Sequence, residues 1–247
     1  MFLKINKTKL DILAIGSHPD DVELGCGATI AKEIAKGKKV GIIDLTRGEL
    51  GTRGSAEIRH EEATNAAKIL GASIRENMGF ADGFFVNDKE HQLALIRMIR
   101  KYQPEMVICN AVDDRHIDHA KGSKLVSDAC FLSGLIKVET FLEGQDKPQE
   151  AWRPKHVYHY IQWKNLQPDV VVDITGFIDT KLKAVFAYKT QFHDSTNNEP
   201  ETPISSKNFA DSITYRARDL GRLVGVEYGE GFTIERYVAV DSLFNLK

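Results

Sequence analysis

The sequence predicts an α/β fold in which a mostly parallel β-sheet is covered by helices on both faces. Short apolar runs alternate with longer segments of helical periodicity, and these segments are long enough to cross over a sheet. Alternating strand and helix patterns are the signature of βαβ units, which place parallel strands side by side. No stretch of the 247 residues reads as a domain linker, so we expect a single domain over residues 1–247.

The first half of the chain carries the regular part of this pattern. The apolar runs that we predict as strands are 11–17, 40–46 and 105–111. The predicted helices have apolar residues at intervals of three and four and end at Gly or Pro. They are 28–37, 56–72 and 91–103.

The second half is less regular. We predict strands at 156–162, 170–175 and 235–240, and helices at 180–192 and 216–226. We expect His156 and His159 to be surface residues of the first of these strands. Segments 142–155 and 193–206, which contain Pro and many polar residues, are predicted to be surface loops.

Charge and composition narrow the range of partners. The formal net charge of −2, with acidic and basic residues interspersed, argues against nucleic acid or an anionic membrane. No apolar stretch approaches the roughly 20 residues of a membrane span, and the run 11–16 is too short for a signal-peptide core. Three cysteines without CxxC spacing indicate neither a disulfide framework nor a cysteine-rich zinc module. We expect a cytoplasmic protein with a small-molecule partner.

The strongest functional signal is the sequence Ser-His-Pro-Asp-Asp at residues 17–21, directly after the first predicted strand. Ligand sites in open α/β sheets form beyond the carboxyl ends of the strands. Pro19 cannot continue a central strand and forces a turn, which helps His18 and Asp21 to converge. The structural alternative for Asp20 is an N-cap of the following helix.

A second cluster runs from Asp114 to His119 and follows the predicted strand 105–111, so it belongs at the same edge of the sheet. His116 and His119 are three residues apart, and a helix there would carry both imidazoles on one face. Asp118 is well placed to orient a ring through its second nitrogen. Capping or solvation is the alternative for this carboxylate.

Together the two clusters indicate a catalytic metal site. Two histidines and one aspartate leave a coordination position open for water, as catalytic zinc requires, although Fe²⁺ and other divalent ions accept the same donors. The remaining carboxylate and imidazole are suited to take a proton and to steady an oxyanion. The residues alone do not decide which of Asp20 and Asp21 binds metal. A metal-binding module without catalysis would not need these extra groups, and a nucleotide-binding module would need more than the incomplete glycine pattern at 25–28.

Four segments resemble the LmbE-like, or PIG-L, deacetylase family, which is built around an AHPDD-type motif and a later HxDH motif. They are 14–30, 46–54, 113–119 and 217–232, with Ser17 in place of the Ala of the first motif. The resemblance extends over nearly all of the chain. The central and C-terminal segments are similar to the bacillithiol biosynthesis branch, which converts N-acetylglucosaminyl malate into glucosaminyl malate.

The resemblance implies a Rossmann-like sheet and assigns a role to each residue of the two clusters. It implies that His18, Asp21 and His119 bind Zn²⁺ and that Asp20 is the general base. It further implies that His116 stabilises the oxyanion and acts as an acid, with Asp118 as its orienting partner.

The resemblance also bears on substrate and assembly. Arg59 and Arg115 fall near the implied site, where an anionic malate group would explain guanidinium donors. The resemblance further implies that this chain forms homo-oligomers, and hexamers are among the assemblies that family members form. The alternative within the enzyme class is an LmbE-like deacetylase or amidase that acts on N-acetylglucosamine, a chitin oligomer or a thiol conjugate.

Overall fold

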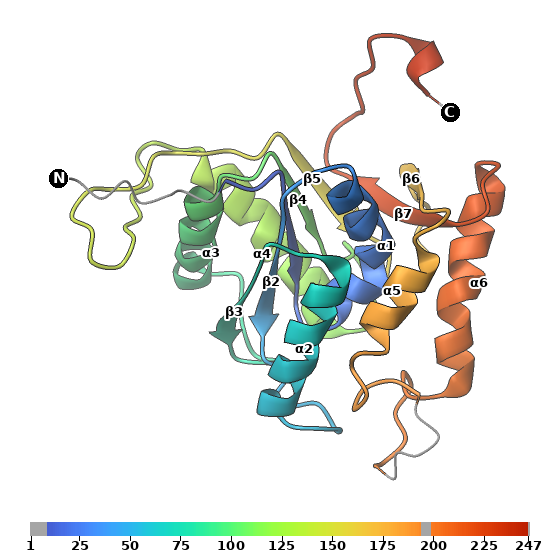
Figure 1. Cartoon of the computed structure of the whole chain (residues 1–247). Helices are drawn as coiled ribbons and strands as arrows, with labels where there is room; N and C mark the ends of the chain where they lie inside the picture. The colour runs from blue at the N-terminus through green and yellow to red at the C-terminus, as the bar shows by residue number, and fades with distance from the viewer. Residues whose placement is uncertain (1–8, 194–198, 247) are drawn as a thin grey trace.

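The computed structural model of the chain describes residues 9–193 and 199–246. The remaining parts of the predicted domain 1–247, and with them part of the predicted loop 193–206, lie outside the described residues. Seven strands form one sheet with helices on both faces (Figure 1), which confirms the predicted fold class. Among the described residues, no helix has the length and apolar character needed to cross a membrane.

The sheet has the strand order β3-β2-β1-β4-β5-β7-β6. Its strands are β1 (Ile12–Gly16), β2 (Val40–Thr46), β3 (Ile74–Phe80), β4 (Met106–Cys109), β5 (His156–Tyr160), β6 (Val170–Asp173) and β7 (Gly229–Ile234). Strands β1 to β5 pair in parallel, whereas β7 is antiparallel to both β5 and β6. The sheet is therefore mostly parallel, as expected, with an antiparallel edge.

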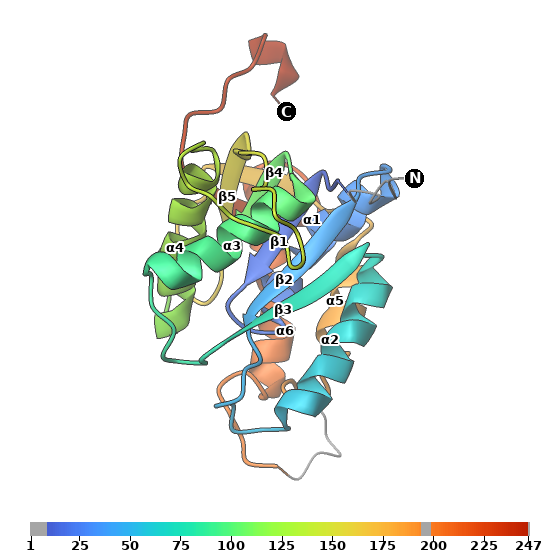
Figure 2. The same ribbon diagram turned by 90° about the vertical axis from the view of Figure 1, so that its left-hand side faces the viewer.

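Helices cover both faces of this sheet (Figure 2), and the two largest hydrophobic clusters lie under these two layers. The helices are α1 (Asp21–Ala35), α2 (Ala56–Leu70), α3 (Lys89–Tyr102), α4 (Ile117–Ser133), α5 (Ile178–Val185) and α6 (Lys207–Leu223). Helices α1, α2 and α5 pack on one face together with Ile42 of β2. Helices α3 and α4 pack on the other face together with Ile43, the next residue of the same strand. Because successive strand residues point to opposite faces, the continuous apolar run 40–46 serves both cores.

The strand order positions the functional residues. The chain moves outward from β1 to β2 and β3, then returns to place β4 on the other side of β1. The connections that leave β1 and β4 therefore diverge, and a crevice opens between the carboxyl ends of these two strands. Both histidine and aspartate clusters follow these strands.

Several sequence predictions need correction in the irregular half. The predicted strand 235–240 is wrong, because the last strand is β7 at Gly229–Ile234 and the chain leaves the sheet after it. His159 was predicted to be exposed but is buried, with Nδ1 2.8 Å from Ser123 Oγ. The prediction also omitted β3, a strand at the edge of the sheet in which Arg75, Glu76 and Asn77 interrupt the apolar residues.

The helix ends also differ from the predicted ones. Helix α1 begins at Asp21, well before the predicted start at residue 28, and has a kink at Cys26. Helix α5 ends at Val185 instead of residue 192, and α6 begins at Lys207 instead of residue 216. At the start of α6, Ser206 accepts a hydrogen bond from the backbone of Phe209. A side-chain cap of this kind fixes a helix start that periodicity alone places poorly.

Two glycines of α1 give a matched test of how tightly this helix packs on the sheet. A Cβ at Gly25 would lie 2.1 Å from a ring carbon of Tyr160, whereas a Cβ at Gly27 would have no side-chain atom closer than 3.6 Å. We expect Gly25→Ala to lower the free energy of unfolding by roughly 1–3 kcal/mol because it overpacks the core. We expect Gly27→Ala to be neutral or to raise it by up to about 1 kcal/mol, because Ala favours a helix more than Gly does. Urea unfolding of both variants measures the contrast, and equal effects would contradict it.

Candidate active site

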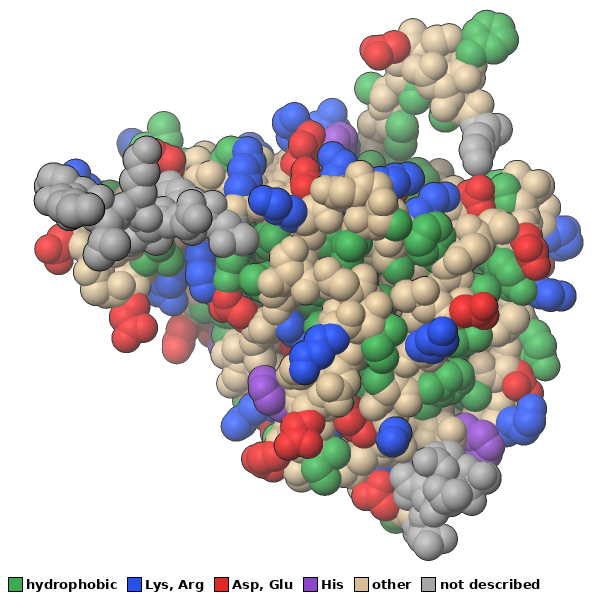
Figure 3. Space-filling view, in the orientation of Figure 1, with side chains coloured by type: hydrophobic (Ala, Val, Ile, Leu, Met, Phe, Trp, Pro, Cys, Tyr) green, Lys and Arg blue, Asp and Glu red, His purple; other side chains and the backbone are tan. Residues whose placement is uncertain are grey.

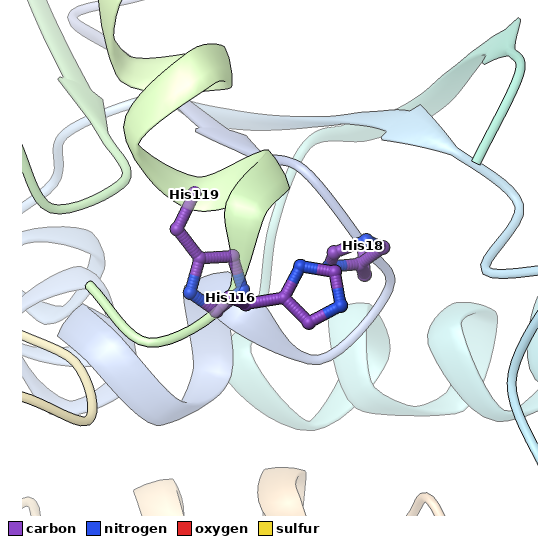
Figure 4. Close-up of side chains that lie close together, drawn as sticks. All are labelled: His18, His116 and His119. Carbon is purple, nitrogen blue, oxygen red and sulfur yellow. The ribbon is translucent and has the colours of Figure 1, made fainter. Parts of the chain in front are cut away.

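Three histidines converge where the carboxyl ends of β1 and β4 meet. His18 lies in the turn after β1, His116 caps the start of α4, and His119 lies in the first turn of that helix. Their rings lie close together in Figure 4, with centroids 4.6 Å apart for His18 and His116 and 5.0 Å apart for His116 and His119. One nitrogen from each ring lies within 4.8 Å of the others. The predicted strand-end placement and three-residue spacing thus bring these side chains together.

Asp21 joins this cluster from the first residue of α1. Its Oδ1 lies 3.1 Å from His119 Nε2, and its Oδ2 lies 3.5 Å from His18 Nδ1. Asn110 and Gln162, which follow β4 and β5, donate hydrogen bonds to this carboxylate at 2.9 and 2.8 Å. Burial alone would raise the pKa of Asp21, but His119 and His18 hold it well below its ordinary value. The carboxylate is therefore ionised and fixed in place.

The far nitrogens of two of the rings face further carboxylates. His119 Nδ1 lies 2.6 Å from Asp114 Oδ2. His18 Nε2 lies 3.1 Å from Asp82 Oδ1 and 3.2 Å from Asp118 Oδ2. Contacts of this kind fix the orientation of a metal-binding imidazole and raise the basicity of its other nitrogen. They leave His18 Nδ1 and His119 Nε2 on the side of Asp21.

The side chain of Asp118 contacts a different histidine from the one expected. We expected it to orient His116, but its carboxylate lies against His18 and accepts a hydrogen bond from the backbone of Gly83 at 2.8 Å. His116 has extended backbone angles, and its Nδ1 accepts from the backbone N–H of Asp118 at 3.3 Å as the N-cap of α4. The His116 ring therefore contacts the backbone of Asp118 at the start of the helix.

The protonation of His116 follows from its surroundings. Burial, together with the neighbouring rings of His18 and His119, lowers the pKa of His116 below its ordinary value. The neutral ring is thus favoured near pH 7. Because Nδ1 accepts a hydrogen bond, the single proton resides on Nε2, which is then available as a donor.

Asp20 occupies an unusual backbone position between the turn and α1. Its φ of 114° lies in the left-handed region, which residues other than glycine adopt only at a cost in energy. Its side chain makes no capping hydrogen bond, so the N-cap alternative does not describe it. Burial raises the pKa of Asp20 to about 7, although the positive charge of Arg59 opposes this shift.

Arg59 reaches Asp20 from α2. Its Nη2 donates to Asp20 Oδ2 at 3.2 Å and to the carbonyl of Pro19 at 2.6 Å, and its Nη1 donates to the carbonyl of Gly48 at 3.1 Å. The guanidinium is buried and ties three neighbouring segments together. Arg59 also lines the cavity described next, but much of its donor capacity is used within the protein.

The histidine cluster opens into a cavity of about 630 Å³, a size typical of small-molecule sites. Its walls include the apolar side chains of Trp163, Phe209 and Ile213, and Arg216 contributes a cation. Arg115, the other predicted substrate contact, also lines this cavity and places its guanidinium 4.5 Å from the centroid of the Trp163 ring. The side chain of Arg115 is exposed.

Four residues that shape the site had no predicted role: Asp82, Asn110, Asp114 and Gln162. The last three lie at or just beyond the ends of predicted strands, so their position at the carboxyl edge of the sheet was a usable signal. Asp82 follows β3. Because that strand was not predicted, the position of Asp82 had no support from the sequence.

The donor set suits a divalent cation. Imidazole nitrogens and a carboxylate oxygen are ligands that zinc and Fe²⁺ both accept. Five aspartates are buried in and around the cluster: Asp20, Asp21, Asp82, Asp114 and Asp118. Burial of so many carboxylates costs free energy unless positive charge is nearby, and a bound divalent cation would reduce this cost.

Comparison with known proteins adds independent evidence. The family profile described as PIG-L: GlcNAc-PI de-N-acetylase matches residues 13–130, which contain both histidine and aspartate clusters. Among solved structures, the conserved protein TT1542 from Thermus thermophilus is similar with a TM-score of 0.83 and 35% identity. That similarity covers 95% of this chain and 98% of TT1542.

Three curated relatives differ in their described activities. The uncharacterized deacetylase YaiS of Escherichia coli K12 is 51% identical over 31% of this chain and 40% of its own length. Diacetylchitobiose deacetylase of Thermococcus kodakarensis is 28% identical over 76% of this chain and 74% of its own. The 4-oxalmesaconate hydratase of Pseudomonas putida is 27% identical over 76% of this chain and 77% of its own. Taken with the fold and the site geometry, these matches show that the chain belongs to the PIG-L, or LmbE-like, deacetylase family.

Proposed function

We propose that this chain is a metal-dependent N-deacetylase that hydrolyses the acetamide group of a small amino sugar. The observation that carries the proposal is the convergence of His18, Asp21 and His119, with the far nitrogen of each ring held by a carboxylate. The names of two relatives, YaiS and the diacetylchitobiose enzyme, support deacetylation. The three cysteines are buried and free, which supports a reducing cytoplasm as the place of action.

In this proposal His18, Asp21 and His119 hold the metal, with zinc as the first candidate and Fe²⁺ as the second. When bound, a divalent ion supplies Lewis acidity for the acetamide carbonyl and lowers the pKa of a water molecule toward ~7. Asp114 and Asp118 keep the two ligand rings in the required orientation. His119 and His18 keep Asp21 ionised, and hydrogen bonds from Asn110 and Gln162 fix its carboxylate in position.

The other side chains of the cluster supply the proton transfers. Asp20 takes a proton from water as oxygen adds to the carbonyl carbon, and Arg59 holds its carboxylate in position. His116 donates a hydrogen bond from Nε2 to the oxygen on which negative charge develops. When the carbon–nitrogen bond breaks, Asp20 gives the proton that it took from water to the nitrogen, which leaves as an amine, and the acyl group is released as acetate.

Acetate release from purified, metal-loaded protein tests this function. We propose N-acetylglucosaminyl malate as the substrate, in the bacillithiol biosynthesis pathway, with free N-acetylglucosamine and a chitin oligomer as the alternatives. Activity on one of these compounds supports N-deacetylation and ranks the candidates. No acetate from any of them would contradict the proposed deacetylase. Because one relative of this chain is described as a hydratase, that result would not contradict the family assignment.

Two arginines give a sharper test of the malate group. We expect Arg115→Ala to lower kcat/KM for N-acetylglucosaminyl malate about 10- to 100-fold, because a charge-assisted hydrogen bond contributes roughly 1.5–3 kcal/mol. Free N-acetylglucosamine lacks the malate carboxylates, so its kcat/KM should hardly change. Arg59→Ala should slow both substrates, because Arg59 also holds Asp20. Equal losses on both substrates in Arg115→Ala, or a wild-type preference for the free sugar, would contradict the malate assignment alone.

A further inference from the structure

We propose that Ser17 is a positioning residue of the metal site. Its hydroxyl, packed against Gly122, sets the distance between the two segments that carry the proposed ligands. Figure 4 shows that His18 lies in the turn after β1, whereas His116 and His119 come from the start of α4. A site divided between two segments binds its metal tightly only if the segments are held at a fixed distance. This role depends on the proposed function, because it concerns the metal site on which that function rests.

The backbone of Ser17 is bound to the ends of two neighbouring strands. Its N–H donates at 2.8 Å to Oδ1 of Asn110, which follows β4. Its carbonyl accepts from the backbone N–H and from Oγ1 of Thr46, the last residue of β2, at 3.0 and 2.9 Å. The residue before His18 is therefore fixed to the strands on both sides of β1.

The hydroxyl of Ser17 adds a contact with α4. Its oxygen lies 2.9 Å from the carbonyl oxygen of Asp118 and 3.1 Å from Asn110 Oδ1, so one proton is shared between two acceptors. Asp118 lies in the first turn of α4. Asn110 also donates to the carboxylate of Asp21 at 2.9 Å. One hydroxyl thus connects the helix that carries His119 to the side chain that holds Asp21.

Gly122 provides the space for this hydroxyl. It lies in α4 one turn after Asp118, and a Cβ at this position would be 2.4 Å from Ser17 Oγ. The next nearest atom, Leu45 Cδ1, would be 3.2 Å away and belongs to the end of a flexible side chain. Glycine is disfavoured inside a helix relative to alanine. The close approach of the Ser17 hydroxyl explains why glycine stands here.

Both residues lie in the interior of the protein. Charged side chains are spread over the solvent-facing surface in Figure 3, whereas Ser17 and Gly122 are buried. Water therefore does not compete for the hydroxyl of Ser17, and its hydrogen bonds are stronger than they would be at the surface. Neither residue lines the cavity. A change at either position reaches the site through the placement of the ligand segments.

A double-mutant cycle on zinc affinity tests this role, with equilibrium dialysis as the measurement. Ser17→Ala should weaken zinc binding about 10-fold, the lower end of what outer contacts of a metal site contribute. Gly122→Ala should weaken it more, up to about 100-fold, because the added Cβ pushes α4 away from the turn. The double variant should bind zinc more tightly than Gly122→Ala alone, because the atom that the Cβ contacts is gone.

Two matched controls separate positioning from general stability. Ser133 is also fully buried and donates its hydroxyl to a carbonyl of α4, that of Cys130, at 2.9 Å. It lies at the other end of this helix from the histidines. Ser133→Ala should lower the stability of the metal-free protein in urea, as Ser17→Ala does, but should not change zinc affinity. Gly27→Ala, which adds a Cβ far less crowded than that of Gly122→Ala, should show no coupling with Ser17→Ala.

Unchanged zinc affinity in Ser17→Ala would overturn the positioning role, and so would an equal loss in Ser133→Ala. Losses in the double variant that simply add would overturn it as well. If Gly122→Ala does not fold, the comparison of the two serine variants decides the question. The measurement needs no substrate, so a protein that binds zinc as expected but releases no acetate would contradict the deacetylase proposal alone. A wild type that binds no zinc would overturn both proposals.

Discussion

Replacement of Asp20 by Asn is expected to remove most of the activity while leaving metal binding intact. The amide cannot accept the proton that the carboxylate takes, and general base catalysis typically contributes about 10²- to 10⁴-fold in rate. Asp20 pairs with Arg59 and is not needed for the convergence of His18, Asp21 and His119. Asn also tolerates positive φ better than most residues, so the turn at position 20 should be preserved.

The measurement combines turnover with metal content. Asp113→Asn is the matched control, because this nearby aspartate is exposed and pairs with Lys164 outside the cluster. We expect wild-type turnover from the control, and one metal ion per chain in both variants. A metal-loaded Asp20→Asn protein with near wild-type turnover would mean that Asp20 has only a structural role. Loss of metal in this variant would instead mean that Asp20 is a ligand.

His119→Ala is expected to weaken metal binding more than the loss of any outer contact does. Removal of a carboxylate that supports a ligand typically costs about 10- to 100-fold in metal affinity, and His119 is proposed to bind the metal itself. Its Nε2 faces Asp21 while its Nδ1 is held by Asp114. Truncation to alanine therefore removes a ligand and leaves Asp114 without this partner.

Equilibrium dialysis against zinc, followed by elemental analysis, measures this affinity without reference to activity. His60→Ala is the control, since this histidine lies on the exposed face of α2. A His119→Ala protein that retains stoichiometric zinc with unchanged affinity would contradict the ligand assignment. In that case His116, whose ring also converges with His18, would be the next ligand to replace.

The sequence predicts the central parallel strands β1, β2 and β4 well because they are largely apolar and buried. The run 40–46, for example, is buried throughout and cannot be mistaken for an exposed segment. The irregular half lacks this signal. Strand β7 contains Gly229 and Gly231, which are poor strand formers, yet a Cβ at Gly229 would lie 2.7 Å from Val171, so close packing requires glycine there. The more apolar segment 235–240 was therefore predicted in its place.

The residues of the site could be predicted from the sequence, but the contacts between them could not. Motif spacing brings the six predicted residues of the two clusters to one edge of the sheet, but it does not determine which carboxylate faces which ring. The contact between Asp118 and His18 depends on how the turn after β1 meets the start of α4. These segments are about one hundred residues apart in sequence. Local periodicity carries no information about such a contact.

The left-handed backbone at position 20 has a consequence for how related chains evolve. Glycine would adopt this conformation without the cost that aspartate bears. The carboxylate is therefore kept against the preference of the backbone, by its role in the reaction and by its pairing with the buried Arg59. A descendant of this chain that no longer needs the reaction relieves the backbone cost by a change to glycine only if Arg59 is replaced as well, because an unpaired buried charge is costly. We expect glycine at position 20, together with the loss of Arg59, to mark family members that have retained the fold and given up the chemistry.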